Sequence, residues 1–194
     1  MTAAVLTVSD GVSDGTREDA SGDLLQELLE AEGLDVVRRV VPDDRDEIAQ
    51  AIEDLADEAA VVLTTGGTGL GSRDVTPEAT ASVLDRPAPG IAEAIRADSI
   101  SKTPHALLSR GVAGVRGRTL VVNLPGSPGG CRDGFDQLAF LDLDSLERET
   151  GGIQDLLARN APSFREHRAQ TFVAFQQIAE GRLERGERQR PSQA

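Results

Sequence analysis

The chain has 194 residues and a formal net charge of −13, and residues 1–140 alone carry 24 acidic against 12 basic side chains. A surface of that sign excludes nucleic acid and acidic membranes as expected partners, and no apolar run approaches the ~20 residues that a membrane-spanning helix needs. The length suits one domain with an appendage, and the single cysteine, Cys131, excludes an internal disulfide framework and favours a reducing cytoplasm.

The first part of the chain predicts strands alternating with helices. A strand is expected over residues 3–8, followed by a polar loop over 12–22 that is either functional or a solvated turn. Four leucines at helical spacing predict a helix that Gly33 closes. Valines then predict a second strand that ends at Pro42, and Asp44 is expected to cap a second helix.

Residues 61–78 hold the most informative stretch, in which a buried strand is followed by a glycine loop and a helix start. Its glycines are Gly66, Gly67, Gly69 and Gly71. Such a density removes Cβ atoms where a phosphate or a ring would approach the backbone, although a purely structural loop is the alternative. The loop is neither a P-loop nor a dinucleotide fingerprint, because the lysine and the glycine spacing of those motifs are missing.

The helix after the glycine loop is predicted to start with Thr76 as its N-cap and Pro77 at its first position. Asp74, just before it, has no evident packing role and is a candidate ligand for a hard cation such as Mg²⁺. Asp43 follows the second strand, where it is either functional or a turn residue.

Later elements complete the alternation. A helix is expected over 91–98, then a polar break over 99–104, then two strands over 111–115 and 118–123 joined through Gly117. A second turn rich in glycine and proline follows the last strand. Ser127 is expected to cap the helix after it, which would leave free backbone N–H groups as a second anion site.

This alternation predicts an α/β fold with a mostly parallel central sheet, formed by a domain over 1–140. The loops after the strands would meet at one edge, where ligands bind in such folds. Residues 141–194 are predicted to be a mainly helical extension with a disordered end. That helix would pack on its own domain or a neighbouring subunit, or bind a partner.

Several ordered motifs resemble the molybdenum-cofactor biosynthesis family of molybdopterin adenylyltransferases and their relatives. The strongest is Thr-Gly-Gly-Thr-Gly at 65–69 continuing through Arg-Asp-Val-Thr-Pro-Glu-Ala-Thr at 73–80. Further matches are Leu-Thr-Val-Ser-Asp at 6–10, Val-Pro-Asp-Asp at 41–44, Leu-Leu-Ser-Arg at 107–110 and Asn-Leu-Pro-Gly-Ser-Pro at 123–128. The turn over 126–132 is closest to a branch whose enzymatic role varies between members.

The resemblance implies a homotrimer of three-layer α/β/α subunits that transfers AMP from MgATP to the terminal phosphate of molybdopterin and releases pyrophosphate. It implies that Asp43 and Asp74 are catalytic and hold Mg²⁺. The positions that match the family's nucleotide and substrate sites are Ser9, Asp10, Thr65, Gly66, Gly67, Thr68, Gly69, Arg73, Thr76, Ser99, Ser109, Asn123, Pro125, Gly126 and Ser127.

Three points stay open at this stage. The sequence does not distinguish which cation neutralises the phosphates: the candidates are Arg73, Arg110 and Lys102. Lys102 is the only lysine in the chain. The main alternative to the enzyme is a non-catalytic carrier or scaffold that binds molybdopterin and contacts other molybdenum-cofactor enzymes. A related domain acting on another nucleotide is a weaker one, because folds are reused.

Overall fold

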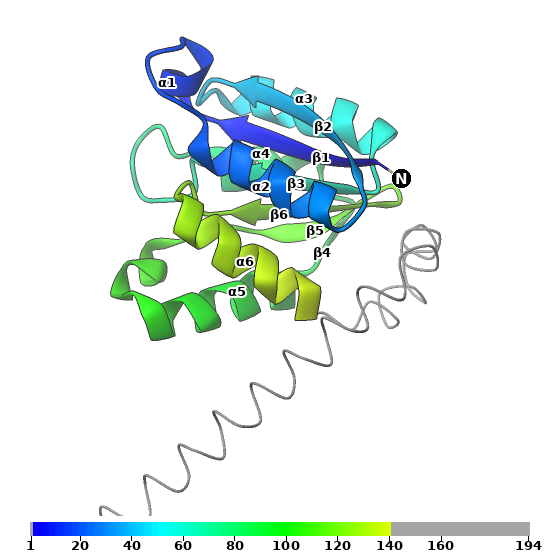
Figure 1. Ribbon diagram of the computed structural model, residues 1–194. Coiled ribbons are helices and arrows are strands. Elements are labelled where there is room, and N and C mark those ends of the chain that lie inside the picture. The colour runs from blue at the N-terminus through cyan, green and yellow to red at the C-terminus, as the bar shows by residue number, and fades with distance from the viewer. Residues whose placement is uncertain (1, 141–194) are drawn as a thin grey trace, which may run out of the picture. The chain divides into compact units, whose positions relative to one another are not determined.

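The computed structural model describes residues 2–140, including the side chains of residues 2–138 (Figure 1). The extension predicted over 141–194 lies outside the described residues. None of the helices in the described range is long and apolar enough to cross a membrane.

Within residues 2–140 a six-stranded sheet has the order β2-β1-β3-β6-β5-β4. The strands are β1 (Thr2–Val8), β2 (Asp35–Val41), β3 (Val61–Thr65), β4 (Arg86–Pro87), β5 (Ala113–Arg116) and β6 (Thr119–Leu124). The neighbours β2, β1, β3 and β6 run parallel, whereas β5 pairs antiparallel with both β6 and β4. The prediction of a mostly parallel sheet is confirmed, and the carboxyl ends of four strands share one edge.

Helices cover both faces of this sheet, which gives the three-layer α/β/α arrangement. They are α1 (Asp10–Ser13), α2 (Ala20–Ala31), α3 (Arg45–Glu58), α4 (Thr76–Val83), α5 (Pro89–Lys102), the 3₁₀ helix η1 (Pro104–Leu108) and α6 (Pro128–Phe140). In Figure 1, α2 and α6 lie in front of the sheet, and α3 and α4 lie behind it. The contacts of the buried side chains place α5 on the same face as α2 and α6.

An apolar core lies on each face of the sheet, because successive strand residues point to opposite faces. On β1, Ala3 and Val5 belong to the core beneath α2, α5 and α6, whereas Ala4 and Leu6 belong to the core against α3 and α4. Aliphatic side chains fill both cores, as expected for a chain with 3 % aromatic residues and no Trp or Tyr.

Local capping chemistry explains several boundaries. The carboxylate of Asp44 accepts the N–H groups of Asp46 and Glu47 at 3.0 and 3.1 Å, which confirms it as the cap of α3. Gly33 takes a φ of 78° after α2, and Gly117 takes 57° between β5 and β6, and both values favour glycine.

Two predicted breaks are shorter in the structure than predicted. The polar loop predicted over 12–22 includes the end of α1 and the first turn of α2, because Asp19 caps α2 by accepting the N–H of Gly22 at 3.0 Å. The polar break predicted over 99–104 is helical up to Lys102. The ammonium of Lys102 lies 2.7 Å from Asp98 one turn earlier and 2.7 Å from Asp133 on α6, and these ion pairs support the last turn of α5.

The predicted cap of α4 is wrong. Thr76 is the first helical residue, and Val75 takes the cap position without a side-chain hydrogen bond. The hydroxyl of Thr76 donates instead to the carbonyl of Gly66 at 3.0 Å. A long-range contact with the glycine loop thus takes the place of a local cap.

Truncation of Ile52 to alanine tests the core against α3, where this side chain is fully buried. We expect Ile52→Ala to lower the free energy of unfolding by about 2–5 kcal/mol, since it leaves a cavity in packed surroundings. Gln50→Ala on the exposed side of the same helix should change it by less than about 0.5 kcal/mol. Urea unfolding measures both, and equal midpoints for the two variants would contradict the packing described here.

Candidate active site

A cavity of about 460 Å³ lies at the edge where β1, β2, β3 and β6 end. This is the switch point of the sheet, where the chain order leaves β1 in both directions. Its lining consists of Thr7, Val8, Ser9, Val12, Arg17, Glu18, Ser21, Asp43, Thr65, Gly66, Gly67, Asp74, Gly126, Ser127 and Pro128. A second cavity, near Gly117 and Thr119, lies at the opposite edge of the sheet and contains none of the predicted site residues.

The glycine turn after β3 requires residues without side chains. Gly66 has a φ of 101°, and a Cβ there would lie 2.1 Å from the carbonyl oxygen of Val8. Gly67 has a φ of 61°, and a Cβ there would lie 2.3 Å from the hydroxyl of Thr76 and 3.1 Å from Asp43. Both glycines are therefore needed for the close approach of β1, β3 and the Asp43 loop.

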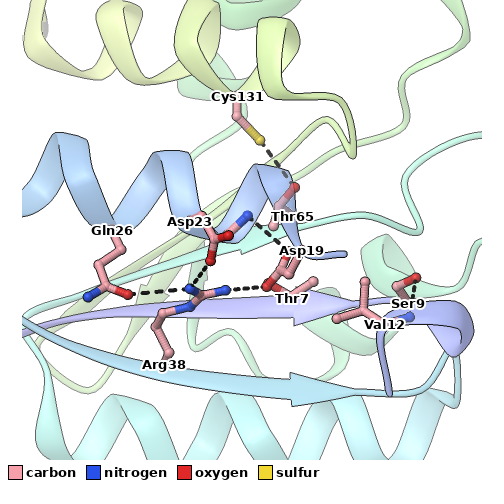
Figure 2. A network of polar contacts seen from close by, with 10 residues as sticks. Thr7, Ser9, Val12, Asp19, Asp23, Gln26, Arg38, Thr65 and Cys131 are labelled. Atoms are coloured by element: carbon pink, nitrogen blue, oxygen red, sulfur yellow. Dashed lines mark hydrogen bonds and ion pairs between the residues drawn. The ribbon is translucent and has the colours of Figure 1, made fainter. Parts of the chain in front are cut away.

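The second turn packs directly on the first. A Cβ on Gly126 would lie 3.1 Å from the Cα of Gly66. Thr65 donates its hydroxyl to the carbonyl of Pro125 at 2.8 Å, and the Cys131 thiol donates to the same carbonyl at 3.0 Å. The Thr65 hydroxyl and the Cys131 sulfur also lie 3.1 Å apart (Figure 2). The two buried groups hold the turn in place.

Ser127 begins α6 at the wall of the cavity. Its hydroxyl accepts the N–H of Gly130 at 3.2 Å, and its carbonyl accepts the N–H of Cys131 at 2.8 Å, which confirms it as a helix cap. The first N–H groups of a helix carry partial positive charge. The wall next to Ser127 is therefore suited to an anion.

Asp43 and Asp74 line the cavity together, although they come from different loops. Asp43 Oδ2 accepts the N–H of Asp10 at 2.9 Å, and Asp10 Oδ1 accepts the N–H of Asp43 at 2.9 Å. Asp74 Oδ2 accepts the N–H of Gly71 at 2.7 Å. Within residues 2–140 each carboxylate is thus held through one oxygen, which leaves its second oxygen for a ligand.

Residues 2–140 contain no group of three His, Cys, Asp or Glu residues that would coordinate a metal by themselves. Mg²⁺ in nucleotide sites needs fewer protein ligands, because one or two carboxylates, the phosphates and water complete its octahedron. The pair Asp43 and Asp74 fits that requirement. It does not fit a metal bound by the protein alone.

The Asp10 carboxylate links the loops around the cavity. Arg73 from the glycine loop donates to both of its oxygens, at 2.8, 2.9 and 3.1 Å. These bonds, with the N–H of Asp43, hold the pKa of Asp10 below its usual range. Asp10 therefore joins the loops after β1, β2 and β3 and does not itself line the cavity.

Arg110 holds the glycine loop from the other side. Its Nε donates to the carbonyl of Gly69 at 2.7 Å, and its guanidinium also donates to the carbonyl of Asp74 and pairs with Glu78. Its backbone N–H donates to Thr68 at 2.9 Å. None of the three cations considered from the sequence, Arg73, Arg110 and Lys102, lines the cavity.

Asn123 lies below the cavity. Its Nδ2 donates to the hydroxyls of Thr64 and Thr80 at 2.9 Å each, and its Oδ1 accepts the N–H of Val112 at 3.1 Å. The amide is buried, and all of its hydrogen-bonding groups are used. Within this structure its role is to support the ends of β3 and β6, and the substrate contact expected from the sequence stays a prediction.

The predicted site residues divide between the cavity and its surroundings. Those that line it are Ser9, Asp43, Thr65, Gly66, Gly67, Asp74, Gly126 and Ser127. Those around or below it are Asp10, Thr68, Gly69, Arg73, Thr76, Asn123 and Pro125. Ser99 in α5 and Ser109 after η1 do not line it, so their predicted substrate roles stay predictions.

The polar stretch over 12–22, predicted to be either functional or a solvated turn, contributes Arg17, Glu18 and Ser21 to the cavity wall between β1 and α2. A partly buried network holds this wall (Figure 2): Arg38 on β2 pairs with Asp19, which also accepts the hydroxyl of Thr7 at 2.7 Å. The available signal was the long polar stretch at a strand end. It did not reveal which residues turn inward.

Comparison with known proteins places this chain among molybdenum-cofactor proteins. Residues 4–144 match the family model described as a probable molybdopterin binding domain. A molybdopterin adenylyltransferase of Helicobacter pylori is 42 % identical over 83 % of this chain and 94 % of its own length. The molybdenum cofactor synthesis protein cinnamon of Drosophila melanogaster is 40 % identical over 73 % of this chain, which spans only 24 % of that protein.

Solved structures agree with this relationship. The crystal structure of the molybdopterin biosynthesis enzyme MoaB from Thermus thermophilus has a TM-score of 0.71 and 44 % identity, over 77 % of this chain and 96 % of that one. The Mog protein of Mycobacterium ulcerans has a TM-score of 0.70 and 40 % identity, over 78 % and 98 % of the two chains.

Replacement of Arg110 by glutamine should loosen the glycine loop, because carbonyls of Gly69 and Asp74 lose a charged donor. We expect the amides of Gly71 and Asp74 to exchange hydrogen about tenfold faster or more. The matched control is Arg39→Gln, which removes a surface ion pair with Asp54 away from the loop. Equal loop exchange in both variants would contradict the role given to Arg110.

Cys131 offers a probe of the second turn, since burial raises the pKa of its thiol from 9.0 to about 11. The reactive form is the thiolate, so the native protein at pH 8 should react with iodoacetamide about 100-fold or more slower than the urea-unfolded protein. The reaction of the unfolded protein should level off above pH 9, whereas that of the native protein should keep rising towards pH 11. Similar rates at pH 8 would show that the turn is open.

Proposed function

This chain belongs to the family of the probable molybdopterin binding domain, and from that premise we propose that it is a molybdopterin adenylyltransferase that uses MgATP. The observation that carries the proposal is the cavity at the sheet edge, where two glycine turns meet the carboxylates of Asp43 and Asp74. The relatives named molybdopterin adenylyltransferases are 40–43 % identical to this chain, which supports the same assignment.

The proposed reaction forms one P–O bond and breaks another. An oxygen of the terminal phosphate of molybdopterin attacks the α-phosphorus of ATP, and the bond from that phosphorus to the bridging oxygen of the β-phosphate breaks. Pyrophosphate leaves with the electron pair, and adenylylated molybdopterin is the product. A phosphate monoester is largely ionised at neutral pH, so the attack needs no general base. Catalysis then consists of positioning and charge stabilisation.

The residues of the cavity suit these two tasks. Gly66, Gly67 and Gly126 let the two turns meet closely at the cavity, and the N-terminal end of α6 after Ser127 adds partial positive charge to its wall. Asp43 and Asp74 would hold Mg²⁺ on the phosphates, where the ion supplies charge neutralisation. The N–H groups of Asp10 and Gly71 hold the two carboxylates, and Arg110 binds the main chain of Asp74.

A carrier or scaffold that binds molybdopterin without turnover is the second candidate. The match to cinnamon favours it, because this chain spans only 24 % of that protein. A related domain therefore also occurs as one part of a larger protein. A carrier would use the same cavity for the pterin. It would not need both carboxylates.

The predicted assembly and surroundings extend the proposal. We propose a homotrimer, and the exposed side chains of Leu70, Ile100, Leu107 and Leu108 supply apolar surface for contacts between copies. The reduced, buried Cys131 is compatible with a cytoplasmic enzyme. Contacts with other molybdenum-cofactor enzymes stay a prediction that co-purification would test.

Asp74→Asn tests the proposed chemistry sharply, because asparagine keeps an acceptor for the N–H of Gly71 but removes the charge. We expect formation of adenylylated molybdopterin, followed by mass spectrometry, to fall about 100-fold or more. Saturating Mg²⁺ should not restore it.

The control is Asp57→Asn at the opposite edge of the sheet, which should retain wild-type turnover. Full activity of Asp74→Asn would refute the metal role of this residue. Absence of product from the wild type, with molybdopterin still bound, would favour the carrier.

A further inference from the structure

One basic side chain lines the cavity, and the reaction described above does not use it. Among the lining residues the carboxylates are Glu18, Asp43 and Asp74, and the only guanidinium is that of Arg17. A site for two phosphorylated substrates in a chain of net charge −13 needs local positive charge, because long-range attraction is missing.

The backbone at Arg17 is anchored by a compact turn. Its N–H donates to the carbonyl of Gly11 at 2.8 Å, and the hydroxyl of Thr16 donates to the same carbonyl at 3.2 Å. Asp14 accepts the N–H and the hydroxyl of Thr16 at 3.0 and 2.7 Å. The turn therefore presents Arg17 at the cavity wall from a fixed backbone position.

The side chain itself is uncommitted. Arg17 is exposed, and within residues 2–140 its guanidinium has no ion pair with a carboxylate. The nearest acids along the chain have other partners, since Asp14 bonds Thr16 and Asp19 bonds Arg38. By contrast, Arg73 and Arg110 are bound to carboxylates at the rim.

We propose that Arg17 binds a phosphate group of a substrate in this cavity. The inference rests on the proposed function and adds a specific binding residue to it. A guanidinium offers a planar pair of donors that matches two phosphate oxygens, which makes arginine well suited to this task. The phosphate belongs either to ATP or to molybdopterin, and Arg17 acts on affinity, since the carboxylates and the glycine turns surround the reacting atoms.

Steady-state kinetics of Arg17→Gln and Arg17→Lys, with each substrate varied in turn, tests the proposal. We expect Arg17→Gln to raise KM for one of the two substrates about tenfold or more and to leave kcat within about twofold. Arg17→Lys should recover part of the affinity, because it restores the charge without the planar fork. The substrate whose KM moves identifies the source of the phosphate. Arg86→Gln on the short edge strand β4 is the matched control and should behave as wild type.

Equilibrium titrations separate this proposal from the proposed function. If the wild type forms no product, the adenylyltransferase assignment fails. Calorimetry then measures the affinity of the same variants for ATP with Mg²⁺ and for molybdopterin, and these affinities test whether Arg17 binds a phosphate. Binding of either ligand weakened tenfold or more by Arg17→Gln supports the inference. Unchanged affinity for both ligands overturns it, as does a wild-type protein that binds neither.

Discussion

Parallel pairing of β3 with β1 on one side and β6 on the other determines where everything else in this structure lies. Thr65 is in register with Thr7 and with Leu124, so three chain segments leave the sheet at the same level. The turns that follow meet so closely that Gly66 leaves no space for a side chain and that a Cβ on Gly126 would lie 3.1 Å from the Cα of Gly66. The cavity exists because these backbones converge.

Polar groups in the interior hold these converging backbones together. Thr65 and Cys131 satisfy the carbonyl of Pro125, and Asn123 joins the ends of the strands. Arg110 likewise donates to carbonyls of the glycine loop. In a strongly acidic chain, several of the few cations therefore hold loops in place, which leaves few to attract a substrate.

The sequence predicted the elements whose signals are local. The strand and glycines of 61–71 and the cap at Asp44 follow from residue types at short spacing, and the structure confirms them. The predictions failed where a residue's structure depends on a partner that is distant in the sequence. Lys102 extends α5 through an aspartate on another helix, and Thr76 bonds the glycine loop where a cap was expected. The two-residue strand β4 exists only through its pairing with β5.

The same distinction applies to the site. Asp43, Asp74 and the glycines carry recognisable motifs, and the structure brings them to one cavity. Arg17 lies in the polar stretch predicted over 12–22, but its place at the cavity wall depends on a turn closed by Gly11 and Thr16, which no motif specifies. The buried positions of Asn123 and Thr65 depend on side-chain packing that residue types alone do not specify.

The residues that line the cavity are far apart in the sequence, and this determines when during folding the cavity can form. The lining runs from Thr7 to Pro128, and the turn that completes it follows β6, the last strand within residues 2–140. Contacts between such distant residues form slowly, because a long loop must first be closed. A nascent chain that ends before β6 lacks one wall, so a ligand cannot assist the early steps of folding. Ligand binding therefore requires that β6 and α6 have docked on the rest of the sheet.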